Sequence, residues 1–154
     1  MKEMKEDLKK AKSVLLSEGL TCVLVRGEDV VRSRVRGVKP LLELIDGRKD
    51  MRGFSAADKV VGRAAAFLYV ILGVDAVYAG MMTKGAVTVF AEYGIMAYYD
   101  STADIVMNRA KDDLCPMEKA VADTGDPFTA LHLIRDALSA LGSPGDGAAQ
   151  QSWT

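Results

Sequence analysis

The stretch that decides the fold runs from Ser55 to Gly80 and reads SAADKVVGRAAAFLYVILGVDAVYAG. Ser55 is a favourable N-cap residue, so the segment behind it predicts a long helix from Ala56 to Leu72. Gly73 ends this helix, because glycine adopts the left-handed conformation that follows many helices. The side chains are apolar on nearly all sides, which is typical of a central helix that is covered by other elements. Residues 74–79 then predict a buried strand.

The chain beyond this stretch predicts a second helix and a parallel strand. Thr83 is a favourable N-cap for a helix through Tyr93, and residues 95–99 predict the next strand. A strand–helix–strand order implies parallel pairing through a right-handed crossover. After a short turn at residues 100–103, residues 105–107 predict a last strand, with a helix as the alternative reading of that segment.

The chain before Ser55 predicts a helix followed by a hairpin. Apolar residues from Met4 to Leu16 recur on one helical face, which indicates an amphipathic first helix. Leu20–Arg26 and Val30–Val35 predict two strands joined by a short turn. Pro40 is favourable in the first turn of a short helix through Leu44, since its missing N–H has no helical partner there.

Two helices and a polar tail complete the sequence. Pro116 begins a short helix through Val121, and Asp126-Pro127 begins an amphipathic helix through Leu141. Residues 142–154 are rich in glycine, serine, alanine and glutamine and predict a disordered tail. The sum predicts one domain over residues 1–141 with an α/β fold, a three-layer α/β/α sandwich around a mixed sheet of about five strands.

The composition of the chain limits the kinds of binding partner that we expect. The 154 residues carry a net charge of −1, with 49% hydrophobic and 27% charged residues, as in soluble globular proteins. Nucleic-acid binding depends mainly on an excess of Lys and Arg, so a dedicated nucleic-acid binder is not expected. The most apolar run is too short to span a membrane, and residues 1–12 lack the apolar core of a secretory leader. Cys22 and Cys115 lie far apart, and two free thiols in a cytoplasmic protein are expected.

Four segments, in this order along the chain, together resemble a known protein family. They are Ser55–Ala66, Gly73–Gly80, Gly94-Ile95, and the run from Asn108-Arg109 to Cys115-Pro116-Met117-Glu118. The combination resembles an uncharacterised prokaryotic family, a domain of unknown function whose fold is cytidine-deaminase-like. The resemblance extends over about Leu8 to Leu141. It implies a fold and no activity.

The resemblance also shows where a zinc site would lie. Zinc deaminases use a His-x-Glu motif on one helix and Pro-Cys-x-x-Cys at the start of the next, with the Glu moving protons to and from the zinc-bound water. Gly62-Arg63-Ala64 would fall in the first region, and residues 81–86, MMTKGA, in the second. Neither contains a zinc ligand. Cys22, Cys115 and His132 have no ligand spacing among them, so we expect no metal, no cofactor and no zinc-dependent hydrolysis.

The central helix carries a cluster of candidate binding residues. Asp58, Lys59 and Arg63 fall in its first two turns, and Lys59 and Arg63 are four residues apart on one face. Two cations at a helix start suit a phosphate or carboxylate. In deaminase-like folds this helix end faces the ligand cleft, which Ser55, Thr83 and Glu118 are also expected to line. A solvated ion-pair edge is the alternative.

A second group of candidate functional residues lies in the segment Cys115-Pro116-Met117-Glu118. A cysteine before a helix can have its thiolate stabilised by the helix N-terminus, which would make Cys115 a candidate catalytic nucleophile. Glu118 can then close the same turn as in a capping box. The alternative is a buried, inert thiol. Thr83 and Lys84 begin the next candidate helix, where N–H groups can bind an anion or simply be capped.

Two classes of function survive. The first is a domain that binds a small anionic or nucleotide-like ligand, with a thiol-based enzyme that uses Cys115 as its narrower form. The second is a non-catalytic interaction domain that forms homo-oligomers through its apolar helices. The sequence leaves open whether the protein is an enzyme.

Overall fold

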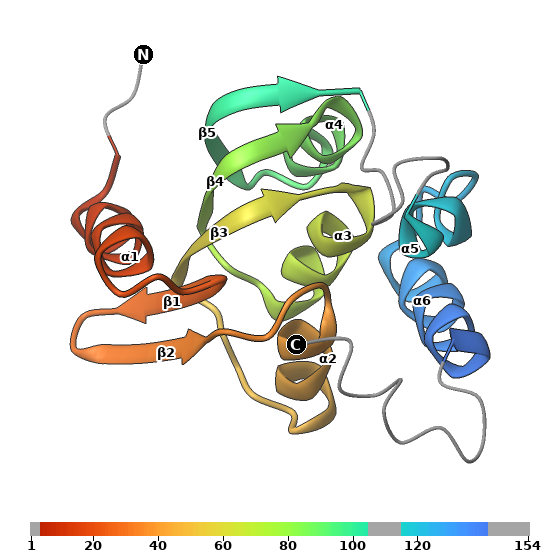
Figure 1. Ribbon diagram of the computed structural model, residues 1–154, viewed down its shortest axis with the longest axis horizontal. Coiled ribbons are helices and arrows are strands. Elements are labelled where there is room, and N and C mark those ends of the chain that lie inside the picture. Colours follow the sequence, from red (N-terminus) through yellow and green to blue (C-terminus); the bar gives the residue numbers. More distant parts are fainter. Residues whose placement is uncertain (1–3, 105–114, 142–154) are drawn as a thin grey trace.

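A mixed sheet of five strands forms the centre of the computed structural model, which describes residues 4–104 and 115–141 (Figure 1). The strand order is β2-β1-β3-β4-β5. The central strand β3 pairs in parallel with β4, which pairs in parallel with β5, whereas β1 is antiparallel to both of its neighbours. The strands are β1 (Cys22–Arg26), β2 (Asp29–Ser33), β3 (Ser55–Val61), β4 (Ala76–Thr83) and β5 (Met96–Ala103). The predicted α/β class with a mixed five-stranded sheet is confirmed.

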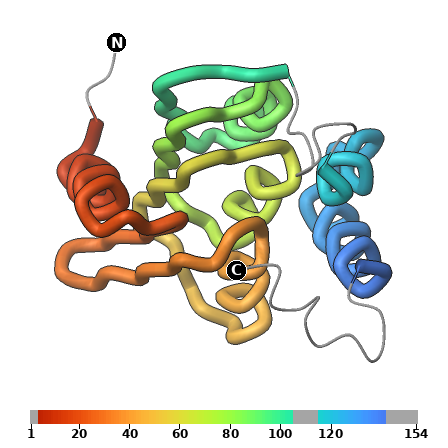
Figure 2. The backbone as a smooth tube through the Cα atoms, viewed as in Figure 1, coloured from red at the N-terminus to blue at the C-terminus, as the bar shows by residue number. Residues whose placement is uncertain are grey.

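Helices cover both faces of the sheet. Of the described helices, α1 (Glu6–Ser17) packs one face, through Leu8, Ala11 and Leu15. The other is packed by α2 (Lys39–Asp46), α3 (Arg63–Leu72) and α4 (Lys84–Glu92). Outside α3 lie α5 (Pro116–Ala120) and α6 (Pro127–Leu141), on the side of the molecule opposite to α1 (Figure 2).

The prediction of one long helix over Ala56–Leu72 is wrong in its first half. Residues 55–61 form β3, and the helix begins only at Arg63, after the extended residue Gly62. The buried start of β3 is followed by two exposed residues, so the segment does not alternate between polar and apolar residues as a half-buried strand does. Ser55 is therefore no N-cap but a buried residue at the start of the central strand.

The remaining elements follow the sequence pattern, with shifted ends. Thr83 caps α4 as predicted, because its Oγ1 accepts a hydrogen bond from the Ala86 N–H at 3.1 Å. Gly73 ends α3 in the left-handed region at φ 82°. The turn predicted at residues 100–103 is wrong, since β5 extends through Ala103. The strand predicted at residues 105–107 and the tail predicted at 142–154 lie outside the described residues.

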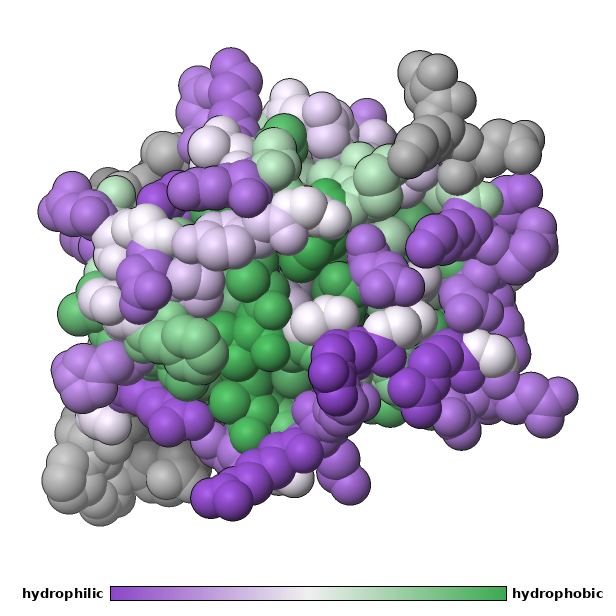
Figure 3. All heavy atoms as spheres, turned by 180° about the vertical axis from the view of Figure 1, so that it is seen from behind, coloured by the Kyte–Doolittle hydropathy of each residue, from purple (hydrophilic) through white to green (hydrophobic). Residues whose placement is uncertain are grey.

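Two apolar layers hold the sheet between its helices. The larger surrounds α3, where Phe67, Leu68 and Tyr69 are fully buried. The smaller joins α1 to the opposite face of the sheet, where Tyr78 is buried. Hydrophobic side chains also gather in the middle of the face seen from behind, with hydrophilic residues around them (Figure 3). None of the described helices is both long enough and apolar enough to cross a membrane.

Candidate functional site

Two helix starts lie side by side at the carboxyl ends of the parallel strands. Gly62 joins β3 to α3, and Thr83 joins β4 to α4. A Cβ built on Gly85 would lie 3.6 Å from the Cβ of Arg63, so the first turns of the two helices touch. Ligands of open α/β sheets bind at the carboxyl ends of strands, and first-turn N–H groups have no partners within their own helix. This edge is therefore the candidate binding site.

The start of α3 already holds a carboxylate, which belongs to Glu118 of α5. Its Oε1 accepts the Arg63 N–H at 2.8 Å, and its Oε2 accepts the Ala64 N–H at 2.8 Å. Gly62 leaves the room for this carboxylate, because a Cβ there would lie 2.5 Å from Oε1. The prediction that Glu118 caps its own helix is thus wrong: it caps α3 instead. The site is shaped to hold a carboxylate-sized anion against two N–H groups and a helix dipole.

Arg63 fastens the segment after α5 to the same helix start. Its Nε donates to the carbonyl of Val121 at 3.2 Å, and its terminal nitrogen donates to the carbonyl of Thr124. The guanidinium also lies 4.9 Å from the centre of the Phe67 ring. Glu118 and Arg63 therefore hold α5 and the segment after it against the start of α3.

Lys59 does not share a face with Arg63, so that prediction is wrong. Lys59 is an exposed residue of β3, and Arg63 belongs to the helix that follows. The second cation near the helix starts is Lys84, which forms an ion pair with Asp104 at 3.0 Å. Of the residues predicted to line the cleft, Arg63, Thr83 and Glu118 meet at the carboxyl edge, whereas Ser55 lies at the far end of β3.

Asp58, which is half-buried, belongs to a hydrogen-bonded chain with the buried residues Tyr69 and Cys22 that the sequence did not predict. Its Oδ2 accepts the Tyr69 O–H at 2.7 Å, and the Tyr69 oxygen lies 3.3 Å from the Cys22 sulfur. Cys22 and Asp58 are register partners on β1 and β3, and Tyr69 reaches them from α3. The only sequence signal was an acidic residue beside Lys59 in an otherwise apolar stretch, which equally suits a helix start.

Burial shifts the pKa values of all three groups upward. Burial raises the pKa of Asp58 to about 7, against hydrogen bonds from Tyr69 and from the N–H groups of Val60 and Lys59 that lower it. Burial likewise raises the pKa of the Tyr69 hydroxyl, and the nearby Asp58 carboxyl raises it further. The pKa of the Cys22 thiol is raised by burial and then by Asp58. Among the residues that the structure describes, no Lys or Arg side chain hydrogen-bonds to these three groups, so no cation offsets the effect of burial, and the Asp58 carboxyl keeps its proton at mildly acidic pH.

Cys115 lies at the N-cap position of α5, partly buried, and its side chain makes no capping hydrogen bond. His132 lies on α6, exposed, and pairs with Asp136 at 3.4 Å. The catalytic role of Cys115, with a thiolate stabilised by the helix N-terminus, stays a prediction.

The two thiols are expected to differ in labelling by iodoacetamide. In Cys115→Ser protein, Cys22 should react at least about 100-fold more slowly than a free thiol, because a thiol with a raised pKa presents little thiolate. In Cys22→Ser protein, Cys115 should react in the folded state. Mass spectrometry of timed samples at pH 7.5 measures both rates. Faster reaction of Cys115 than of free glutathione would support a thiol enzyme, and labelling only on unfolding would end that hypothesis.

Within residues 4–104 and 115–141, no three His, Cys, Asp or Glu side chains gather closely enough to hold a metal ion. The fold and the arrangement at the carboxyl edge of the sheet define the class of protein. It is an α/β domain in which two helices start side by side at the carboxyl ends of parallel strands, and the Glu118 carboxylate of the same chain occupies one of these starts.

The comparison with known protein families assigns the chain to one of them. A model described as a domain of unknown function, DUF1893, matches residues 10–138, and the chain belongs to that family. A solved structure of a DUF1893 family protein, TM1506 from Thermotoga maritima, is similar, with 28% sequence identity and a TM-score of 0.78. The match covers 90% of this chain and 92% of that one. No curated protein matches the sequence.

Proposed function

We propose that this protein is a metal-free, cytidine-deaminase-like domain that binds a small anionic or nucleotide-like ligand at the adjoining starts of α3 and α4. The observation that carries the proposal is the Glu118 carboxylate, which the chain holds against two backbone N–H groups in a space that Gly62 keeps open. A carboxylate or phosphate of a ligand has the same charge and the same acceptor geometry.

Binding requires the ligand to replace Glu118. The helix that carries Glu118 has five residues, and Met117 within it and Val121 just after it are buried in the larger apolar layer, so its movement has to expose them. Its movement would also release Arg63 from the carbonyls of Val121 and Thr124. A free guanidinium beside two N–H groups offers the fork-like donor set that phosphates prefer. Lys84 adds a second positive charge at the neighbouring helix start.

The residues at this edge do not fit a catalytic zinc ion. The positions at the two helix starts carry Gly62, Arg63, Thr83 and Lys84, none of which supplies a zinc ligand. The nearby carboxylate of Glu118 is already bound to N–H groups rather than turned outward. We therefore assign no hydrolytic step to this site.

Titration of ¹⁵N-labelled protein with inorganic phosphate, AMP and CMP tests the proposal. At least one probe is expected to give saturable shifts of the Arg63, Ala64 and Gly85 amides. Glu118→Ala should tighten binding at least about thirtyfold, because the ligand no longer displaces a carboxylate whose hydrogen bonds contribute about 2 kcal/mol or more. Arg63→Ala should weaken binding about tenfold through loss of a charge-assisted hydrogen bond.

Glu92→Gln is the matched control, because Glu92 is an exposed acid at the far end of α4. It should leave the affinity unchanged. The proposal fails if none of the three probes gives saturable shifts with either the wild type or folded Glu118→Ala protein.

A further inference from the structure

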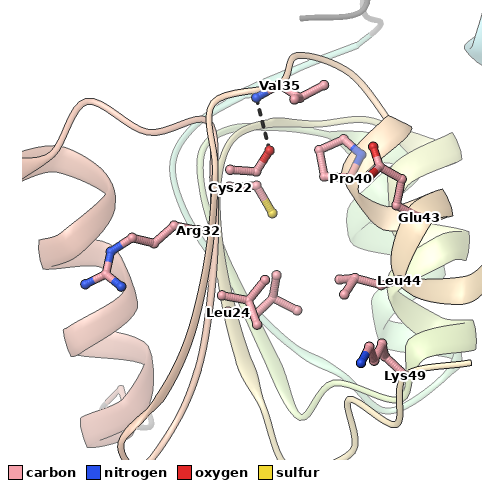
Figure 4. Close-up of a pocket in the computed structure, with 10 residues that line it drawn as sticks. Cys22, Leu24, Arg32, Val35, Pro40, Glu43, Leu44 and Lys49 are labelled. Carbon is pink, nitrogen blue, oxygen red and sulfur yellow. Dashed lines mark hydrogen bonds between the residues drawn. The ribbon is translucent and has the colours of Figure 1, made fainter. Parts of the chain in front are cut away.

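A cavity of about 210 Å³ lies between the β1–β2 hairpin and α2, away from the carboxyl edge. Its walls are mainly apolar, with Leu24 on the sheet side and Pro40 and Leu44 on the helix side (Figure 4). Val31 of β2 also lines it. Pockets for drug-sized ligands measure roughly 300–1,000 Å³, so this cavity has room only for a smaller molecule. It is separate from the site of the proposed function.

The inner wall of the cavity carries the end of the hydrogen-bonded chain that Cys22 forms with Tyr69 and Asp58. The Cys22 sulfur points from β1 toward α2, into the space between them (Figure 4). The thiol contacts the Tyr69 hydroxyl, which donates to Asp58. Because these groups satisfy one another, the inner wall offers an occupant a soft, weakly polar surface rather than a charged one.

The charged groups that line the cavity lie at its rim. Lys49 and Glu43 line the cavity from the side of α2, and no partner is recorded for either charged group among the described residues. Figure 4 shows the Lys49 ammonium turned toward the cavity. Arg32 contributes only its backbone side, since its guanidinium turns toward α1 and pairs with Glu18 at 3.0 Å.

The segment that builds the mouth is strongly basic. Residues 30–49 contain six Lys and Arg against two Asp and Glu. Asp46 is already paired with Arg135, and of the cations Arg32 is paired with Glu18. An excess of one sign of charge around a cleft concentrates ligands of the opposite sign. The balance at this mouth therefore favours an anion over a cation.

We propose that the cavity binds a small organic carboxylate with an apolar body, such as a short-chain fatty acid or an aromatic acid. The hydrocarbon part fills the space against Leu24, Leu44 and the Cys22 thiol, and the carboxylate pairs with Lys49. Glu43 opposes this charge and so limits the affinity.

Titrations of the wild-type protein with hexanoate, octanoate and benzoate test the site, followed through the amides of Leu24 and Leu44. Saturable shifts are expected for at least one of these acids and not for octylamine. Lys49→Ala should weaken the affinity about fivefold, as expected for a partly exposed ion pair. Glu43→Gln should strengthen it about twofold by removing a like charge.

Two further variants separate the cavity from general surface charge. Val31→Trp places a large side chain in the cavity from the edge strand and should abolish the shifts. Arg36→Ala removes an exposed cation of the same basic segment that does not line the cavity, and should leave them unchanged. The proposal is overturned if the carboxylates give no saturable shifts, if folded Val31→Trp protein binds as the wild type does, or if octylamine binds more tightly than octanoate.

Discussion

Replacing Gly62 by alanine is expected to lower the free energy of unfolding by about 2–3 kcal/mol, as for overpacking of a closed site. The added Cβ would lie 2.5 Å from one carboxylate oxygen of Glu118 and 3.0 Å from the other. The backbone of Gly62 is extended, at φ −100° and ψ −176°, which alanine also adopts. The loss therefore comes from the displaced carboxylate and not from backbone strain. Urea denaturation measures it directly.

A double-mutant cycle shows whether Glu118 is the cause. Glu118→Ala removes two charge-assisted hydrogen bonds and is expected to cost about 2–4 kcal/mol by itself. In that background Gly62→Ala no longer meets a carboxylate, so the double variant should be about as stable as Glu118→Ala. The coupling free energy should exceed about 1 kcal/mol, within the range for residues in contact.

The chain provides a matched glycine for this experiment. Gly85 lies in the first turn of the neighbouring helix, and a Cβ there would meet Arg63 at an ordinary 3.6 Å. Gly85→Ala should be neutral or slightly stabilising, because alanine favours the helix. Additive losses from Gly62→Ala and Glu118→Ala would contradict the role assigned to the carboxylate.

Much of the architecture follows from local sequence signals. Thr83 and Gly94 set the limits of α4, and a proline begins each of the last two helices or stands just inside it. These signals work because they act through neighbouring backbone groups. Residues 55–61 have no such signal, because their buried start is followed by exposed Lys59 and Val60 and they do not alternate between polar and apolar residues as a half-buried strand does. The cap at Ser55 was consequently assigned to the wrong element.

The sequence predicted one of the two helix starts at the candidate site. The Thr83 cap located the start of α4, whereas the start of α3 was placed at Ala56 instead of Arg63. The Glu118 carboxylate reaches Arg63 from 55 residues away, and no local pattern indicates that pairing. The same reason hides the contact between Cys22 and Tyr69, which are 47 residues apart. Both depend on how the layers pack.

Asp58→Asn is expected to remove most of the pH dependence of stability between pH 5 and 8. With a folded pKa of about 7 and an ordinary pKa of 3.8, Asp58 binds a proton more tightly in the folded state than in the unfolded one. Its contribution to stability is therefore fully present below about pH 4 and is lost as the pH rises to about 7. At pH 8 the carboxylate is charged in both states, and the folded protein carries the full penalty of burial.

Asparagine keeps the hydrogen-bonding shape without the charge, so Asp58→Asn should raise the free energy of unfolding at pH 8 by about 2 kcal/mol. At pH 4 the variant and the wild type should be nearly equal, because the wild-type carboxyl then keeps its proton in the folded state. Urea denaturation at both pH values gives the comparison.

The control is Asp123→Asn, which changes an exposed acid that follows α5 and should leave the profile unaltered. Tyr69→Phe provides a second check, because it removes a hydrogen bond that lowers the pKa of Asp58. In that variant the loss of stability should extend to a higher pH than in the wild type. The prediction is contradicted if the wild type gains stability from pH 5 to 8 and Asp58→Asn gains just as much. Asp58 would then be ionised in the folded protein throughout this range, and burial would not control its titration.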